Sequence, residues 1–355
     1  MSGPSAVFGR MNRPNSKAFN SQSVFSMRIL LSVPYSSNLF DDAPEIVGHE
    51  IVARRRQNDW GQSRARRLFG HLREIIRILK DANSFDAVVF MTMGSEIFFA
   101  SRLKRWLCPR TALIGADILL ARQGIVGRWI GKWIHGADGL VVVRNGDRDT
   151  LARRYGLESS RCEFVPFPSP SATGLPPSTD DGFIYSAGWA HRDWETFAAA
   201  MEQVPYRAIV SPGTPFTMSP AAAEHVTILP MQSPQDGRQY LAAASVVVLA
   251  MKDTDLPSGP LIMLDAFVAG KAVIATAVNG TRDYLVDGVT GLMVPPGDPA
   301  ALAAAIHRVM EDPALRARLG RAAQEVARNE FTVRNYLTGI VSACEHYRCS
   351  DAVKV

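Results

Sequence analysis

Long apolar runs and cysteines are both scarce in this sequence of 355 residues. No run of about 18 consecutive apolar residues occurs, so no membrane-spanning helix is expected. The four cysteines, Cys108, Cys162, Cys344 and Cys349, lack the spacing of metal ligands, and they are too few for a disulfide framework in a chain of this length. These absences favour a reducing compartment, and we expect the cytoplasm.

The first 26 residues contain no acidic side chain and no continuous apolar segment. A secretory signal peptide needs such a segment, so none is expected. The content of Ser, Asn and Arg predicts a flexible extension over residues 1–26, with an organellar transit peptide as the alternative.

Short apolar runs alternate with segments of helical periodicity, which predicts an α/β protein with parallel sheets. A hydrophobic content of 47% in 355 residues supports about two cores. A cluster of Pro, Ser and Gly from Pro168 to Ser178 is typical of a linker. We therefore predict one domain over residues 27–170 and a second over residues 171–345.

One stretch of the second domain carries the clearest signal. A buried strand over residues 245–250 is followed by a polar turn and by a helix, with Ser258 or Gly259 as cap and Pro260 at its first position. Such a helix start presents unpaired N–H groups toward the strand ends, where the natural occupant is an anion such as a diphosphate. A strand over residues 272–275, a turn and a hairpin-like rim follow, up to Asp298.

This stretch resembles the donor-binding half of the family 4 glycosyltransferases of GT-B architecture. The matching segments are Leu264-Asp265-Ala266, Gly270-Lys271, Val273-Ile274-Ala275-Thr276, Asn279-Gly280-Thr281-Arg282-Asp283-Tyr284, Asp287-Gly288-Val289-Thr290-Gly291-Leu292 and Val294-Pro295-Pro296-Gly297-Asp298-Pro299. The match covers roughly residues 180–345 and is only architectural over residues 27–170. It implies two Rossmann-like, doubly wound domains that face a cleft, with a C-terminal helix that crosses back to the first domain.

The resemblance also implies a donor site for a nucleotide-diphosphate sugar of the UDP or GDP type. Relatives carry two glutamates eight positions apart, one near the donor sugar and one on the ribose. Asp265 stands at the second position and keeps two acceptor oxygens for a diol. Pro257 falls at the first position, so Asp255 is the substitute candidate for the catalytic acid. The residues expected to complete this part of the donor site are Lys252, Ser258, Gly259 and Leu261.

A glycine turn opens the second domain and is expected to hold the donor phosphates. Gly188 lets backbone approach a ligand, and relatives place an arginine directly after this glycine. Trp189 occupies that place here, which leaves Arg192 to neutralise the diphosphate. A guanidinium suits this task because it binds phosphate oxygens through two N–H groups at once. The alternative is a surface ion pair between Arg192 and Asp193 or Glu195.

The first domain is expected to bind the acceptor. In relatives a histidine and an aspartate close the strand that here ends near residue 115, and only Asp117 survives, with Ala116 in place of the histidine. Asp117 is therefore a second candidate catalytic acid, with a turn cap as the alternative. The loops after two other strands offer Tyr35, Ser36 and Arg144 as acceptor-binding candidates, with ordinary solvated loops as the alternative.

Charge is unevenly divided between the two domains. Residues 1–170 carry 25 Lys or Arg and 15 Asp or Glu, and the remainder carries 14 and 19. The basic half suits an anionic acceptor or an acidic membrane surface, with nucleic acid as a weaker alternative that no basic motif supports. Residues 122–137 combine an apolar stripe and two tryptophans with the cations Arg128 and Lys132, which lie one turn apart on another face. This segment fits either an interfacial helix at the inner face of the membrane or a helix packed on the sheet.

The expected reaction is transfer of the donor sugar to a glycan, lipid-linked or small-molecule acceptor, with retention as an implication of the resemblance. The motif Asp253-Thr254-Asp255 sits where relatives bind without metal, so we predict metal-independent transfer and no cofactor besides the donor substrate. Two alternatives remain open. One is a degenerate GT-B protein that binds without catalysis, and the other is a nucleotide-sugar epimerase of related architecture.

Overall fold

The computed structural model describes residues 26–33, 48–55, 64–91, 96–117, 131–169, 175–214, 217–254 and 260–351. The chain divides into two compact units. One unit holds the described residues up to Pro166 together with the last helix, and the other holds Phe167–Thr332.

The first unit is built on a parallel six-stranded sheet in the order β2-β1-β3-β4-β5-β6. Its strands are β1 (Met27–Val33), β2 (His49–Arg55), β3 (Ala87–Met91), β4 (Ala112–Ala116), β5 (Gly139–Val142) and β6 (Cys162–Phe164). All residues of β3, β4 and β5 are buried, as expected for strands covered on both faces. Edge strand β2 has no counterpart among the predicted strands, because its alternating pattern of half-buried residues lacks a continuous apolar run.

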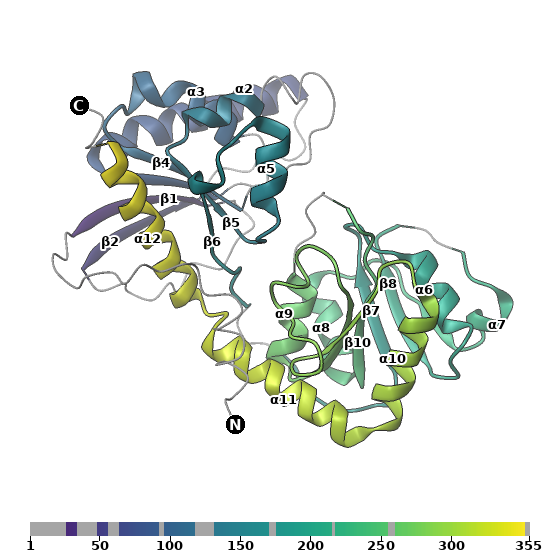
Figure 1. The fold of residues 1–355 in the computed structure, drawn as a ribbon. Helices are drawn as coiled ribbons and strands as arrows, with labels where there is room; N and C mark the ends of the chain where they lie inside the picture. The colour runs from purple at the N-terminus through teal and green to yellow at the C-terminus, as the bar shows by residue number, and fades with distance from the viewer. Residues whose placement is uncertain are drawn as a thin grey trace. The chain divides into compact units, whose positions relative to one another are not determined.

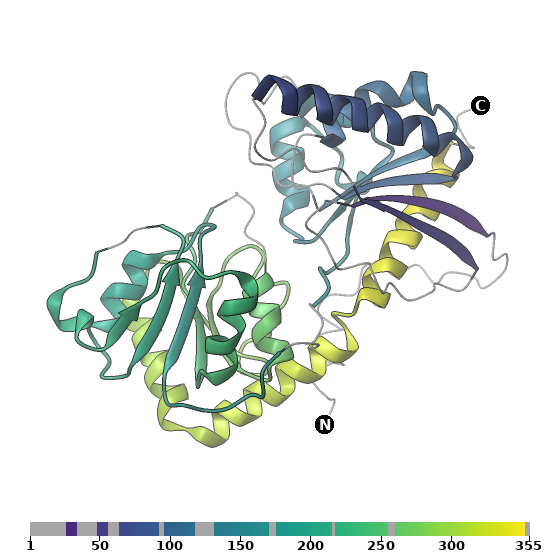
Figure 2. The same cartoon turned by 180° about the vertical axis from the view of Figure 1, so that it is seen from behind.

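Helices α2 (Arg64–Asp81), α3 (Glu96–Leu107) and α5 (Asp147–Tyr155) cover one face of this sheet, and α12 (Val333–Asp351) covers the other (Figures 1 and 2). Short 3₁₀ helices lie at Ala82–Ser84, Lys132–Gly136 and Ser159–Arg161. Gly139 allows α12 to pack closely on β5, because a Cβ at this glycine would lie 2.0 Å from the ring of Tyr347. The predicted return of the C-terminal helix to the first domain is confirmed.

The second unit has its own parallel six-stranded sheet, in the order β12-β11-β10-β7-β8-β9. Its strands are β7 (Ile184–Gly188), β8 (Ala208–Pro212), β9 (Val226–Ile228), β10 (Val246–Leu249), β11 (Ala272–Thr276) and β12 (Leu292–Val294). Its helices are α6 (Trp194–Met201), α7 (Pro220–Ala223), α8 (Pro234–Ala243), α9 (Leu261–Val268), α10 (Pro299–Glu311) and α11 (Pro313–Asn329). Helices α6 and α10 cover one face, and α8 and α9 cover the other (Figure 1).

Two local predictions for the second unit were wrong. The hairpin-like rim is absent, because β12 pairs in parallel with β11. The cap of α9 is Pro260, whose side chain cannot accept a hydrogen bond, so this helix begins one residue later than predicted.

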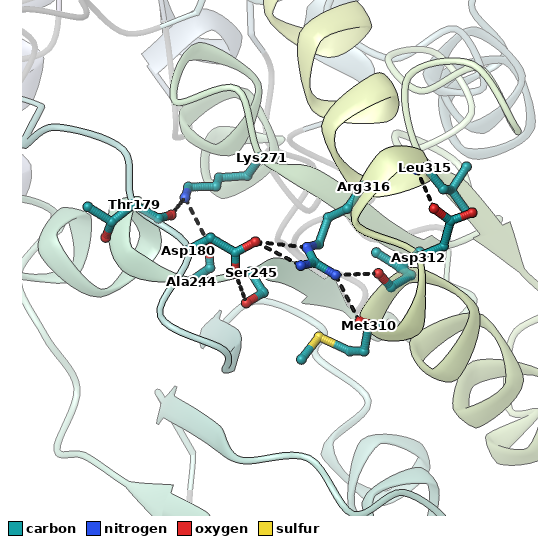
Figure 3. A network of polar contacts seen from close by, with 10 residues as sticks. Thr179, Asp180, Ala244, Ser245, Lys271, Met310, Asp312, Leu315 and Arg316 are labelled. Carbon is teal, nitrogen blue, oxygen red and sulfur yellow. Dashed lines mark hydrogen bonds and ion pairs between the residues drawn. The ribbon is translucent and has the colours of Figure 1, made fainter.

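A polar network fixes the segment that leads into β7 (Figure 3). The buried ammonium of Lys271 donates to the carbonyl oxygens of Thr179 and Ala244. Asp180 accepts from Ser245 Oγ and from Arg316, whose Nη2 lies 2.8 Å from Asp180 Oδ2. Arg316 also donates to the last carbonyls of α10. These contacts lie at the amino ends of β10 and β11, at the edge opposite to the predicted donor site.

Candidate functional site

The turn after β7 folds Arg192 back against the strand it follows. Arg192 Nε donates to the Ala187 carbonyl at 2.8 Å, and Nη1 contacts Met251 Sδ. Gly188 has a φ of 116° and leaves the space that the guanidinium fills, because a Cβ there would lie 2.8 Å from Arg192 Nη2. His191, with a φ of 52°, completes the reversal. The cation is thereby held at the carboxyl ends of two neighbouring strands, β7 and β10.

Arg192 has no carboxylate partner among the described residues, so the predicted alternative of a surface ion pair is wrong. Asp193 instead caps α6 and accepts from Thr196 N at 3.1 Å. Burial lowers the pKa of Arg192 to about 10, which leaves the guanidinium charged at neutral pH. A partly buried cation without a counter-charge gains free energy when an anion binds beside it. The geometry therefore suits an anionic ligand at this edge of the sheet.

The start of α9 lies at the same edge, because this helix follows β10. Its first amide groups lack intrahelical acceptors, and Leu264 N makes the first such bond, to the Pro260 carbonyl at 2.9 Å. Leu261 is 51% exposed at the first helical position. Lys252 is exposed just beyond β10, and its N–H donates to the His191 carbonyl at 2.9 Å, which ties this turn to that of Arg192.

Asp265 lies one turn into α9 and forms an ion pair with Arg238 of α8. Arg238 Nε and Nη2 lie 3.0 and 2.9 Å from the same oxygen, Asp265 Oδ1. Burial raises the pKa of Asp265, while the neighbouring guanidinium of Arg238 acts in the opposite direction. Arg238 was not predicted from the sequence, since a single arginine in a polar segment carries no signal of its partner.

The first unit brings Asp117 together with Arg144. Asp117 follows β4 with a φ of 51°, and burial raises the pKa of its carboxyl to about 6, with Arg144 opposing and Asp147 adding to the shift. Arg144 follows β5 and is almost fully buried. Its Nε donates to Asp147 Oδ2 at 3.0 Å, so its charge is compensated inside the unit. Asp147 was not anticipated from the sequence, where this loop resembled a solvated one.

The other predicted site residues lie outside the described residues. These are Tyr35 and Ser36 in the first unit and Asp255, Ser258 and Gly259 in the second. The segment 122–137 is described only from Gly131 onward. There Ile134 is buried and Trp133 packs on Phe99, with ring centroids 5.4 Å apart, so this part contacts the core.

Neither a metal-binding cluster nor a membrane-crossing helix occurs in the part of the chain that the structure describes. No three His, Cys, Asp or Glu side chains lie close enough there to hold a metal ion. None of the described helices combines the length and hydropathy that crossing a membrane requires.

Comparison with known proteins finds a family match within the second unit. Residues 221–326 match the model of the family described as glycosyl transferases group 1. This part of the second unit is therefore similar to the group 1 glycosyl transferases. A D-inositol 3-phosphate glycosyltransferase of Streptomyces avermitilis is 40% identical over 94 residues, which is 25% of this chain and 20% of that protein. The chain thus matches only about a fifth of that relative's length.

Solved structures share the fold of this chain. A sucrose-phosphate synthase from Thermosynechococcus elongatus superposes with a TM-score of 0.63 at 19% identity, covering 92% of this chain and 100% of the other. Anabaena Alr3699/HepE, solved in complex with UDP, superposes with a TM-score of 0.64 at 14% identity, covering 90% and 100%. The predicted GT-B fold of two Rossmann-like domains is confirmed.

Proposed function

We propose that this chain is a glycosyltransferase that moves a sugar from a nucleotide-diphosphate donor to an acceptor. The observation that carries the proposal is Arg192, a partly buried guanidinium without a carboxylate partner among the described residues, folded against Gly188 at the carboxyl edge of the second sheet. Ligands of open α/β sheets bind at this edge. UDP bound to the structurally similar Anabaena protein supports a donor of the UDP type, with GDP as the other candidate base.

In this proposal each charge at the edge acts on one part of the donor. Arg192 and the amides at the start of α9 stabilise the negative charge that grows on the diphosphate as the glycosidic bond breaks. Asp265 accepts hydrogen bonds from the ribose hydroxyls. The exposed ammonium of Lys252 offsets part of the negative charge on the same phosphates. The transferred sugar keeps its anomeric configuration, as the family resemblance implies.

The first unit supplies the acceptor side. Asp117 follows β4 at the carboxyl edge of its sheet, and its raised pKa lets it carry or accept a proton near neutral pH. We propose Asp117 as the acid or base that exchanges a proton with the acceptor hydroxyl, or with the leaving group. Arg144 positions this region through its buried pair with Asp147 and does not itself bind an anionic acceptor.

No metal is needed in this scheme, because Arg192 and the helix amides supply the positive charge that the leaving diphosphate requires. Acceptors that fit the basic first half are anionic or lipid-linked glycans, and small molecules with an acidic group. Contact with an acidic membrane would follow from the same charge, and we place the protein in the cytoplasm.

A donor screen with a release assay tests the proposal. The protein is melted with UDP- and GDP-sugars, and any donor that raises the melting temperature is incubated with candidate acceptors while free nucleoside diphosphate is measured. We expect a shift with one base type, and release that Arg192→Met reduces at least tenfold. No shift with any donor would favour a scaffold protein, and interconversion of the sugar without an acceptor would favour the epimerase.

A further inference from the structure

Arg238 reaches Asp265 from the neighbouring helix in an asymmetric way. Both of its contacting nitrogens, Nε and Nη2, lie against Oδ1, at 3.0 and 2.9 Å. Among the described residues, the second oxygen, Oδ2, has no hydrogen-bond partner. One half of the carboxylate is therefore anchored, and the other half remains available to a ligand.

The surroundings hold this pair in a partly buried position. The side chains of Arg238 and Asp265 are only 18% and 14% exposed. The ring of Tyr185, from β7, stacks on that of Tyr240, with centroids 6.3 Å apart. Gly237 leaves room for this arrangement, because a Cβ there would lie 3.1 Å from the Tyr185 hydroxyl oxygen. Partial burial makes the pair stronger and more rigid than an exposed one.

A short acidic side chain needs such an anchor more than a long one does. Asp265 lies on α9 with a single methylene between the backbone and the carboxylate. The helix therefore sets how far the carboxylate reaches, and a single rotamer sets its orientation. Burial disfavours the charged form of this acid, and Arg238 is the one group that opposes the effect among the described residues. Loss of Arg238 would leave a carboxylate that is both free to rotate and more readily protonated.

We propose that Arg238 is a positioning residue, which holds Asp265 Oδ1 so that Oδ2 accepts a hydrogen bond from a ribose hydroxyl of a nucleoside diphosphate. The inference rests on the proposed function. It adds that recognition of the ribose depends on two residues from different helices. It also assigns the choice between ribo- and deoxyribonucleotides to this pair.

A purely structural role for the same ion pair makes a different prediction. If Arg238 only fastens α8 to α9, its loss lowers stability and weakens all nucleotides alike. If Arg238 positions Asp265, its loss removes the preference for ribose over deoxyribose. Inorganic pyrophosphate reports on the Arg192 end of the site alone, so its affinity should not change.

The experiment measures binding of UDP, GDP, their 2′-deoxy counterparts and pyrophosphate by calorimetry. The proteins are the wild type, Arg238→Met, Arg238→Lys, Asp265→Asn and, as matched control, Arg321→Met, which removes an exposed arginine of α11. We expect the wild type and the control to bind the ribonucleotide about tenfold more tightly than its deoxy form, since one hydrogen bond to a charged group is lost. Arg238→Met should reduce this ratio to about one, and Arg238→Lys should restore part of it.

Two further results are expected, one from a double variant and one from the pH dependence of binding. Asp265→Asn in the Arg238→Met background should cause no additional loss of the ratio. In Arg238→Met, affinity for the ribonucleotide should decline at a higher pH than in the wild type as the solution is acidified. If the fold of Arg238→Met is impaired, Arg238→Lys and Asp265→Asn carry the same comparison.

A wild-type ratio retained in Arg238→Met would overturn the inference while leaving the proposed function intact. Equal weakening of the ribonucleotide, its deoxy form and pyrophosphate would also overturn it, in favour of the structural role. A wild-type protein that binds pyrophosphate but neither nucleotide would contradict the proposed function itself.

Discussion

The guanidinium of Arg192 occupies the space that a side chain at Gly188 would fill. A Cβ at Gly188 would lie 2.8 Å from Nη2 and 2.9 Å from Nε of Arg192. The glycine also has a φ of 116°, a backbone conformation that residues with a side chain rarely adopt. A side chain at residue 188 would therefore displace the guanidinium of Arg192.

Substitution of this glycine should weaken nucleotide binding strongly. Gly188→Ala combines a strained backbone with displacement of Arg192, and we expect nucleoside diphosphate affinity to fall at least tenfold in calorimetry. Gly182→Ala is the matched control, because Gly182 also has a positive φ, of 73°, but faces open space. The control should lose about 1 kcal/mol of stability and keep its affinity. Equal loss of affinity in both variants would refute the role of the contact with Arg192.

The buried pair of Arg144 and Asp147 should be far more costly to break than to replace. Arg144→Met leaves Asp147 buried without its partner, so we expect urea denaturation to show a loss of about 3–5 kcal/mol. Arg144→Met combined with Asp147→Leu removes both charges and should recover much of this loss. A single variant as stable as the wild type would show that the pair contributes nothing.

Asp117 should make stability fall as the pH rises from about 4 to about 6. Burial raises the pKa of this acid to about 6 in the folded protein, above its unfolded value of about 3.8, so the folded state holds the extra proton in this window. Asparagine tolerates the left-handed backbone at this position, so Asp117→Asn should keep the fold while it removes the titrating carboxyl group. Urea denaturation at several pH values should therefore show a weaker pH dependence in the variant, and identical profiles would contradict the assignment.

Lys271 should produce the opposite slope at alkaline pH. Burial lowers the pKa of this ammonium to about 8 in the folded protein, below the ordinary value of 10.5. The unfolded state binds more protons between these values, so stability should rise with pH through this window. Lys271→Met should flatten the rise in thermal melts between pH 8 and pH 10. A wild type whose melting temperature only declines there would disagree with this account.

Transfer should proceed in the presence of a chelator. The proposed stabilisation of the leaving diphosphate uses Arg192 and the helix amides, so saturating EDTA should leave the rate of nucleoside diphosphate release unchanged within a factor of about two. Restoration of a lost rate by added Mg²⁺ or Mn²⁺ would show that a metal takes part.

The sequence predicted most of the second unit because its signals are local. The apolar run at residues 246–249 and the glycine at residue 270 each identify an element without knowledge of its neighbours. Edge strand β2 was not predicted because its residues are only half buried. Its apolar pattern is therefore weak, and the neighbouring arginines obscure it. The parallel pairing of β12 was missed because register depends on the partner strand.

The site was predictable only residue by residue. Arg192 was predicted from its place after Gly188. Its contact with the Ala187 carbonyl depends on the chain reversal at His191, which the presence of a histidine in the sequence does not predict. The pairs Arg238 with Asp265 and Arg144 with Asp147 depend on packing between elements or on burial of a loop. Such partners are set by tertiary structure, and sequence spacing reveals them poorly.

The most direct test of the central claim is calorimetric titration of inorganic pyrophosphate into the wild type, Arg192→Met and the control Arg308→Met, which removes an exposed arginine of α10. We predict binding to the wild type and to the control, and at least tenfold weaker binding to Arg192→Met with its melting temperature preserved. Equal affinity in all three proteins, or no binding to the wild type, would contradict the assignment of this edge as a pyrophosphate site.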